Sequence, residues 1–144
     1  MTEVAFHFNV PNPTDYICRL LRKAVGSGAR VVVTGQEKAL ELLDEALWAF
    51  SATDFIAHCG LGADPATLAI TPIVFAGSIA DLPHRDVLLN LSATVPDGFE
   101  RFNRVIEVVG PGAADRLAGR ARWKQYTDHG HLITRHDLGA QRPA

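Results

Sequence analysis

The sequence has few cysteines and no long apolar run, and each shortage excludes a class of protein. Its two cysteines, Cys18 and Cys59, lie 41 positions apart and match neither a disulfide framework nor a metal-binding spacing. No apolar stretch approaches the roughly 18 residues that a transmembrane helix needs. The N-terminal run lacks the basic start and small-residue cleavage site of a signal peptide. We therefore expect a cytoplasmic protein without membrane contact.

Positive charge is not in excess either. The chain carries 14 basic and 16 acidic residues, which gives a net charge of -2. Proteins that coat nucleic acid or membranes through bulk electrostatics have strongly basic surfaces, so any such contact must be local here. With 144 residues, 47% of them hydrophobic, the chain can bury one ordinary core. We expect a single domain over 1–138 and a flexible C-terminal tail over 139–144.

A glycine-rich phosphate-binding loop is also missing. After the first predicted strand comes Pro11-Asn12-Pro13, where nucleotide-binding α/β proteins carry a glycine-rich turn. The glycines of Gly60-Leu61-Gly62 lie in a predicted loop and not between a strand and a helix. A nucleotide-binding α/β protein therefore remains only an alternative, and we expect no cofactor.

What the sequence does contain is an alternation of strand-like and helix-like segments. Strands are expected at 4–10, 30–34, 73–76, 86–91 and 105–109, with an edge strand at 132–135. Helices are expected up to residue 24 and at 36–50, 96–103 and 113–127, and a long loop at 51–67. This order predicts a three-layer α/β/α fold with a mostly parallel central sheet flanked by helices, a Rossmann-like topology without a nucleotide-binding loop.

Two groups of side chains suggest chemistry but match no known catalytic or metal-binding set. The candidate metal ligands near the C-terminus are Asp128, His129, His131, His136 and Asp137. Their order and spacing fit neither a structural nor a catalytic metal site, so we interpret them as a solvated terminal segment. His58 and Cys59 could be a base and a nucleophile, but adjacent side chains on an extended chain point apart. We expect no metal and no catalytic residue.

The helix predicted over 113–127 has two distinct faces. Its predicted buried face holds four apolar residues within about 100° of arc: Ala114, Leu117, Ala118 and Ala121. A separate arc holds Arg116, Arg120, Trp123 and Lys124, with no acid between Arg116 and Lys124. Cations near a helix C-terminus complement the helix dipole, but this does not explain Trp123. The face suits an acidic, aromatic-containing peptide or single-stranded nucleic acid.

The helix predicted over 36–50 also carries a tryptophan outside its apolar stripe. The stripe consists of Ala39, Leu40, Leu43, Ala46 and Leu47, all at helical spacing. Trp48 lies on the opposite side, among acidic residues. Either the following loop folds back and covers it, with Phe55 as the covering residue, or the two rings form an apolar patch for a partner protein. Both readings remain open from the residues alone.

Several ordered segments resemble the chi subunit family of bacterial DNA polymerase III. They are LDEALW (43–48), RDVLLNL (85–91) and RARWKQY (120–126), with VVV (31–33) and QEK (36–38) before the first and FIAH (55–58) after it. The resemblance covers most of the chain. It implies a non-catalytic adaptor of the clamp loader in DNA replication, which contacts single-stranded DNA only indirectly.

The resemblance also implies two binding surfaces. The C-terminal tail of single-stranded DNA-binding protein, which is acidic and ends in Phe, would bind Arg116, Arg120, Trp123 and Lys124, with Val109 and Gly130 as walls. The psi subunit, or a substitute clamp-loader or helicase partner, would dock on a second surface. That surface would contain Trp48, Phe50 and Phe55.

Overall fold

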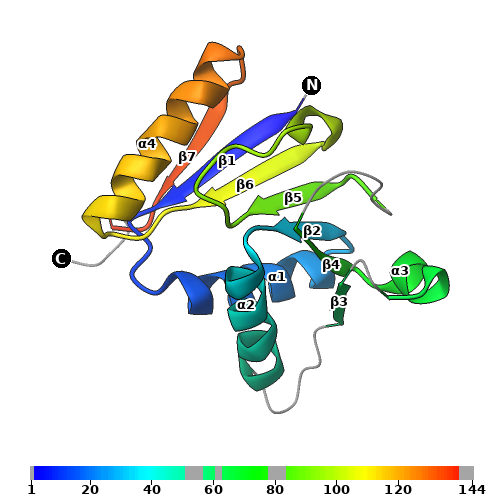
Figure 1. Ribbon diagram of the computed structural model, residues 1–144. Coiled ribbons are helices and arrows are strands. Elements are labelled where there is room, and N and C mark those ends of the chain that lie inside the picture. Colours follow the sequence, from blue (N-terminus) through cyan, green and yellow to red (C-terminus); the bar gives the residue numbers. More distant parts are fainter. Residues whose placement is uncertain (1, 51–56, 61–62, 78–83, 140–144) are drawn as a thin grey trace.

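The computed structural model describes residues 2–50, 57–60, 63–77 and 84–139, and these form a seven-stranded sheet with helices on both faces (Figure 1). All paired strands are parallel, in the order β3-β4-β2-β5-β6-β1-β7. The strands are β1 (Glu3–Phe8), β2 (Val31–Thr34), β3 (His58–Gly60), β4 (Ile73–Ala76), β5 (Val87–Asn90), β6 (Arg104–Val108) and β7 (Ile133–Asp137). The predicted α/β fold with a parallel sheet is confirmed.

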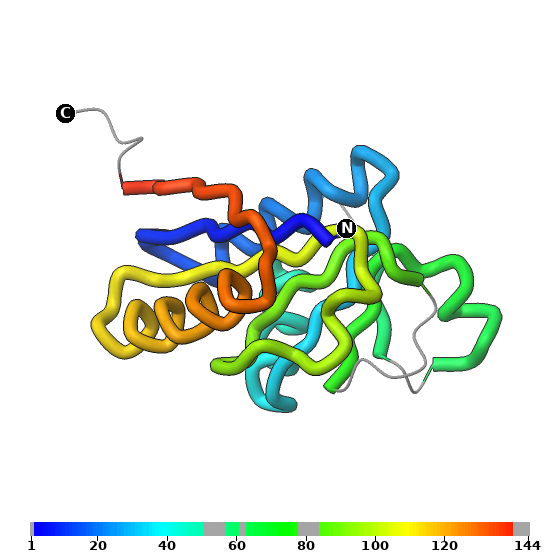
Figure 2. Tube along the Cα trace, turned by 90° about the horizontal axis from the view of Figure 1, so that it is seen from above, coloured from blue at the N-terminus to red at the C-terminus, as the bar shows by residue number. Residues whose placement is uncertain are grey.

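Helices cover the two faces of the sheet unequally. They are α1 (Pro13–Gly26), α2 (Glu37–Phe50), α3 (Pro65–Ile70) and α4 (Ala113–Asp128), with a 3-10 turn at Phe99–Arg101. Alternate strand residues belong to two apolar clusters, one beneath α1 and α2 and the other beneath α4. Figure 2, which looks down on the molecule, shows α1 and α4 on opposite sides of strands β1 and β6. The three layers place α4 on the face opposite α1 and α2.

Local sequence explains where α1 begins and why β2 lies in the middle of the sheet. Asn12 caps α1 by accepting a hydrogen bond from the Asp15 backbone N–H at 3.3 Å, and Pro13 occupies the first turn, where it displaces no helical bond. The next strand, β2, consists of three valines and a threonine and is buried along its whole length. Burial on both faces is typical of central strands in parallel sheets.

The sequence suggested one long loop over residues 51–67, and the structure differs. The described part of this range contains β3 and the start of α3, which Asp64 caps by accepting the Thr67 backbone N–H at 2.8 Å. Residues 51–56 and 61–62 lie outside the described residues. The helix expected over 96–103 is only the 3-10 turn. The edge strand is confirmed as β7, which pairs with β1, and residues 140–144 of the expected tail are not described.

The buried side of α4 is not the one that the apolar pattern predicted. Leu117, assigned to the core, is 70% exposed, whereas Gly119, Arg122 and Tyr126 are buried. The reason is a polar network beneath the helix, centred on the fully buried Glu107 of β6. Three alanines and one leucine offer little apolar area to bury. Arg122 and Tyr126 must instead face the sheet to satisfy the buried Glu107 carboxylate, so the prediction was wrong.

Three donors surround the Glu107 carboxylate. Arg122 Nε donates to Oε1 at 2.9 Å, and both Tyr126 Oη and Asn90 Nδ2 donate to Oε2, at 2.7 and 2.8 Å. Burial raises the pKa of Glu107, while the Arg122 charge and these donors oppose that rise. The network fixes the rotation of α4 about its axis, and so determines which of its side chains face the adjoining cleft.

Candidate functional site

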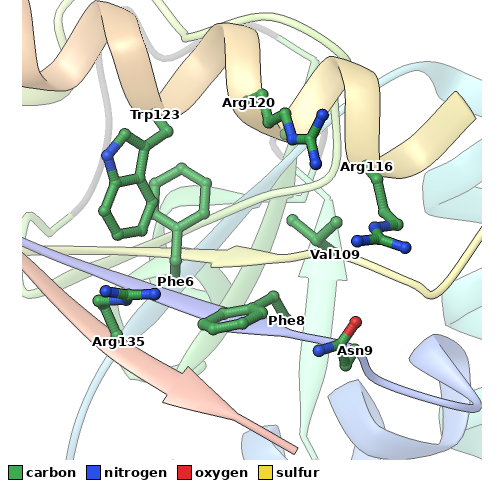
Figure 3. Close-up of a pocket in the computed structure, with 9 residues that line it drawn as sticks. Phe6, Phe8, Asn9, Val109, Arg116, Arg120, Trp123 and Arg135 are labelled. Carbon is green, nitrogen blue, oxygen red and sulfur yellow. The ribbon is translucent and has the colours of Figure 1, made fainter. Parts of the chain in front are cut away.

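A cavity of about 420 Å³ opens between α4 and the strands β1 and β7 (Figure 3). It lies beside the face of the sheet that α4 covers. Its lining residues come from β1, β7, α4 and the segments that follow β1 and β6: Phe6, Phe8, Asn9, Val109, Arg116, Gly119, Arg120, Trp123 and Arg135. We call this cavity the α4 cleft.

Aromatic rings form much of the α4 cleft surface. Phe6 and Phe8 alternate along β1 and therefore share one face of the sheet. The Phe6 and Trp123 ring centroids are 5.0 Å apart and the planes are tilted by 58°. This is a favourable arrangement for an aromatic pair. Trp123 is thus half-buried at the cleft wall, and not freely exposed as the helical arc suggested.

Three arginines surround this apolar surface. Arg116 and Arg120 project from successive turns of α4, and Arg135 projects from β7 on the other side (Figure 3). The Arg135 guanidinium lies 5.9 Å from the centroid of the Phe8 ring and 5.7 Å from that of Trp123. Within the described part of the chain, no acidic side chain forms an ion pair with any of the three. The cleft therefore presents uncompensated positive charge around aromatic rings, which suits an anionic ligand with an apolar group.

The structure brings together most, but not all, of the residues assigned to this site from the sequence. Arg116, Arg120, Trp123 and Val109 line the α4 cleft. Lys124 and Gly130 do not line it, and Lys124 is exposed farther around the helix.

Sequence reasoning missed five lining residues: Phe6, Phe8, Asn9, Gly119 and Arg135. The alternation of Phe6 and Phe8 was a usable signal, because both must face the same side of the first strand. Arg135 could be found only from the register, which pairs it with Phe6.

Gly119 allows α4 to approach the cleft floor closely. A Cβ at this position would lie 3.0 and 3.2 Å from the two methyl carbons of Val109. This spacing is tighter than ordinary van der Waals contact. Glycine is therefore the residue that fits where α4 crosses Val109.

The second predicted surface surrounds Trp48 at the C-terminal end of α2. Trp48 is 60% exposed, and its ring centroid lies 5.2 Å from that of His58 on β3. His58 is itself buried and pairs with Asp44 of α2 at 2.7 Å. Phe50 is half-buried against the apolar cluster beneath α1 and α2, with the Arg22 guanidinium 5.1 Å from its ring centroid. Phe55 lies outside the described residues.

The histidines near the C-terminus each contact other residues of the fold. His129 bonds to the Gln125 carbonyl oxygen at 2.7 Å, the His131 ring lies against Phe99, and the His136 ring stacks on that of His7 with centroids 4.4 Å apart. Among the described residues, no group of three or more His, Cys, Asp or Glu side chains is arranged to hold a metal ion. No helix in that part of the chain has the length and apolarity needed to cross a membrane.

Fold and cleft together define a parallel α/β protein with a cationic, aromatic-lined binding cleft and without a glycine-rich loop after its first strand. The model of the family described as DNA polymerase III chi subunit, HolC, matches residues 1–134. The chain belongs to the DNA polymerase III chi subunit family. The chi subunit is a component of the replication machinery.

Individual relatives agree with this assignment. The chain is 32% identical over 122 residues to the DNA polymerase III subunit chi of Pseudomonas aeruginosa. The aligned region covers 84% of this chain and 83% of the relative. It is 30% identical over 127 residues to the subunit of the same name from Haemophilus influenzae, with 87% of each chain covered. The match to the Escherichia coli K12 subunit chi is 30% over 111 residues, covering 76% of this chain and 75% of the relative.

Proposed function

We propose that this chain is a non-catalytic accessory subunit of the clamp loader that binds the C-terminal tail of single-stranded DNA-binding protein in the α4 cleft. The observation that carries the proposal is the combination of three arginines without ion-pair partners in the described structure and an aromatic surface between them. An acidic tail that ends in Phe supplies the complementary groups, namely carboxylates and one ring.

Each part of such a tail has a suitable counterpart in the cleft. The guanidinium groups of Arg116 and Arg120 can bind carboxylates through two parallel hydrogen bonds, a geometry that lysine does not offer. The terminal ring would pack on Trp123 and the Phe8 side. Lys124 and Gly130 lie outside the cleft lining, so we assign them contacts with residues farther along the tail.

The second surface completes the proposed adaptor. We assign Trp48, with Phe50 and Phe55, to the docking of a psi subunit or of a substitute clamp-loader or helicase partner. The large exposed fraction of the Trp48 ring supports this assignment, because exposed tryptophans are enriched where proteins bind one another. Phe50 is half-buried and would contribute mainly by supporting the end of α2.

The proposed place of action is the cytoplasm. Both cysteines are free thiols, Cys18 buried and Cys59 partly buried, which agrees with a reducing compartment.

Peptide titration tests the tail-binding proposal. A short acidic peptide ending in Phe is titrated calorimetrically into the wild type and into Arg120→Ala, with Arg101→Ala as the control. Arg101 is also an exposed arginine, but it lies in the 3-10 turn and does not line the cleft. We expect Arg120→Ala to weaken binding by about tenfold, because it removes charge-assisted hydrogen bonds, and Arg101→Ala to match the wild type. Equal binding by all three proteins, or binding by none, would contradict the proposal.

A direct single-stranded DNA binder is the second candidate function. Aromatic rings beside arginines also suit stacked bases and phosphates, so the same cleft supports this reading. The two functions differ in how their affinities depend on salt, because a polyanion that contacts several phosphate-binding groups releases counterions on binding.

A further inference from the structure

We infer that Arg135 is a specificity-determining residue of the α4 cleft, and that it binds a side-chain carboxylate of the ligand upstream of the terminal aromatic residue. The inference deepens the proposed function and rests on it. Arg135 is assigned no role by the helical pattern, because it lies on β7 and not on α4.

The position of Arg135 is set by strand register. β7 pairs with β1 so that Arg135 lies opposite Phe6, on the face that forms the cleft surface. Its guanidinium is near two rings at once, 5.9 Å from Phe8 and 5.7 Å from Trp123. Contact with ring faces orients a guanidinium while leaving its N–H groups available at the edges. Arg135 is therefore held in place and still able to bind an anion.

The arginines stand on two different walls. Arg116 and Arg120 belong to α4, whereas Arg135 belongs to β7, and aromatic side chains lie between them (Figure 3). A ligand ring that fills the space between the walls would separate a carboxylate on one wall from the arginine on the other. Two carboxylates, one on either side of an apolar group, would therefore complement all three arginines. A chain that ends in an aromatic residue and carries an acid before it has this arrangement.

The path of the ligand chain decides which carboxylate goes to which wall. Strand β7 is the last strand of the sheet in the described structure, so a chain that leaves the cleft over Arg135 crosses no further strand. On the other side, α4 stands along the cleft. The terminal carboxylate therefore goes to the paired arginines Arg116 and Arg120, and an upstream side-chain carboxylate goes to Arg135.

The nearest acid on β7 does not neutralise this arginine. Asp137 follows Arg135 on the same strand, but its Oδ1 accepts hydrogen bonds from Asn9 Nδ2 at 2.8 Å and from the Gly139 backbone N–H at 3.0 Å. No ion pair joins Asp137 to Arg135 among the described residues. The positive charge of Arg135 thus remains available to a ligand.

A double-mutant cycle between protein and peptide tests this role. Three peptides are titrated: an acidic peptide ending in Phe, the same peptide with its Asp residues replaced by Asn, and the same peptide with an amidated C-terminus. Each is titrated into the wild type, Arg135→Gln and the control Arg101→Gln. On the acidic peptide we expect Arg135→Gln to weaken binding by about three- to tenfold. That loss should vanish on the Asn peptide and persist on the amidated one.

The conservative variant Arg135→Lys separates charge from packing. It keeps the positive charge, so it should recover part of the affinity that Arg135→Gln loses on the acidic peptide. On the Asn peptide it should bind like the wild type and Arg135→Gln. Thermal unfolding of each variant shows whether it is folded.

The outcomes that overturn the inference differ from those that overturn the proposed function. No binding of the acidic peptide by the wild type would overturn both. Wild-type binding that Arg135→Gln leaves unchanged would overturn only the role of Arg135. A loss that vanishes on the amidated peptide would show that Arg135 binds the terminal carboxylate, and would overturn the assignment to an upstream acid.

Discussion

At the scale of single residues, Glu107 has the greatest influence on how the candidate site is oriented. Its carboxylate accepts hydrogen bonds from Arg122 and Tyr126, which lie one turn apart on α4. A buried ion pair adds little net stability, but breaking one partner leaves a buried charge without compensation and costs about 3–5 kcal/mol. Rotation of α4 would break both bonds at once. The helix is therefore held in one orientation, in which Arg116 and Arg120 face the cleft.

His7 is the residue from which a pH dependence of stability follows. Burial first, and then the charges of His136 and Arg104, lower the pKa of His7 to about 4. Its ring is also close to Tyr16, with Nδ1 and Oη 2.5 Å apart. In the unfolded chain a histidine has a pKa near 6.5. Between about pH 6.5 and 4 the unfolded state therefore binds more protons than the folded state at this position.

We expect the free energy of unfolding to fall as the pH drops through this window. The contribution of His7 is fully present above about pH 6.5 and is lost progressively toward pH 4, because the unfolded state is protonated first. After a discount for solvent screening at a half-buried site, the loss amounts to about 1–2 kcal/mol. Urea unfolding at a series of pH values measures it. His7→Gln should flatten the slope in this window, and an unchanged slope would show that other groups cause it.

At the scale of elements, α4 shows what apolar periodicity can and cannot predict. The sequence located the helix over 113–127, and the structure has it at Ala113–Asp128. The buried face was misassigned, since periodicity counts apolar residues and Arg122 is not one. Its buried guanidinium depends on Glu107, which is 15 positions earlier in the chain and on another element. No local pattern contains that pairing.

The cleft was likewise predictable only in part. The side chains that α4 supplies, Arg116, Arg120 and Trp123, follow from helical spacing alone. The opposite wall depends on which strand lies beside β1, and Arg135 enters only when β7 pairs there. Sequence reasoning therefore recovered one wall of the cleft and missed the other.

Replacing Gly119 tests how closely α4 must pack. Gly119→Val places methyl groups where a Cβ alone would already be 3.0 Å from Val109, so α4 must move away from the sheet. We expect a loss of about 1–3 kcal/mol in the free energy of unfolding, as is usual for overpacking. The acidic peptide should also bind more weakly, because α4 carries one wall of the cleft. Urea unfolding and peptide titration measure the two effects.

Ala121→Val is the matched control for this substitution. It introduces the same side chain in the same helix, but at an exposed position that does not line the cleft. We expect its stability to stay within about 0.5 kcal/mol of the wild type and its peptide affinity to be unchanged. If Gly119→Val behaves like this control, the close packing at Val109 is not what positions the helix.

At the scale of the whole molecule, the parallel sheet was predictable and its strand order was not. Alternating strands and helices indicated a parallel α/β fold, because parallel strands require crossover connections. The order β3-β4-β2-β5-β6-β1-β7 places β1 between β6 and β7. That arrangement follows from long-range burial, such as Val4 and Phe6 packing beneath α4, and not from any local signal.

Charge is distributed unevenly over the molecule, and this separates the two candidate functions. The net charge is -2, while three arginines gather around the α4 cleft. A long polyanion such as single-stranded DNA extends beyond the cleft and meets a surface that is acidic on balance. A short tail with a terminal ring meets only the cleft, and burial of that ring is not screened by salt.

We therefore expect the acidic peptide and bare DNA to respond differently to salt. Peptide binding should weaken only modestly up to about 0.15 M salt, because the apolar contribution persists while that of the arginines is screened. A short oligothymidine strand should bind more weakly than the peptide throughout and lose measurable affinity in this range. If only the three arginines contact phosphates, its logarithmic salt slope should be no steeper than about -2. Fluorescence anisotropy over a salt series measures both ligands. Tight DNA binding with a steeper slope would favour the direct DNA binder over the tail-binding adaptor.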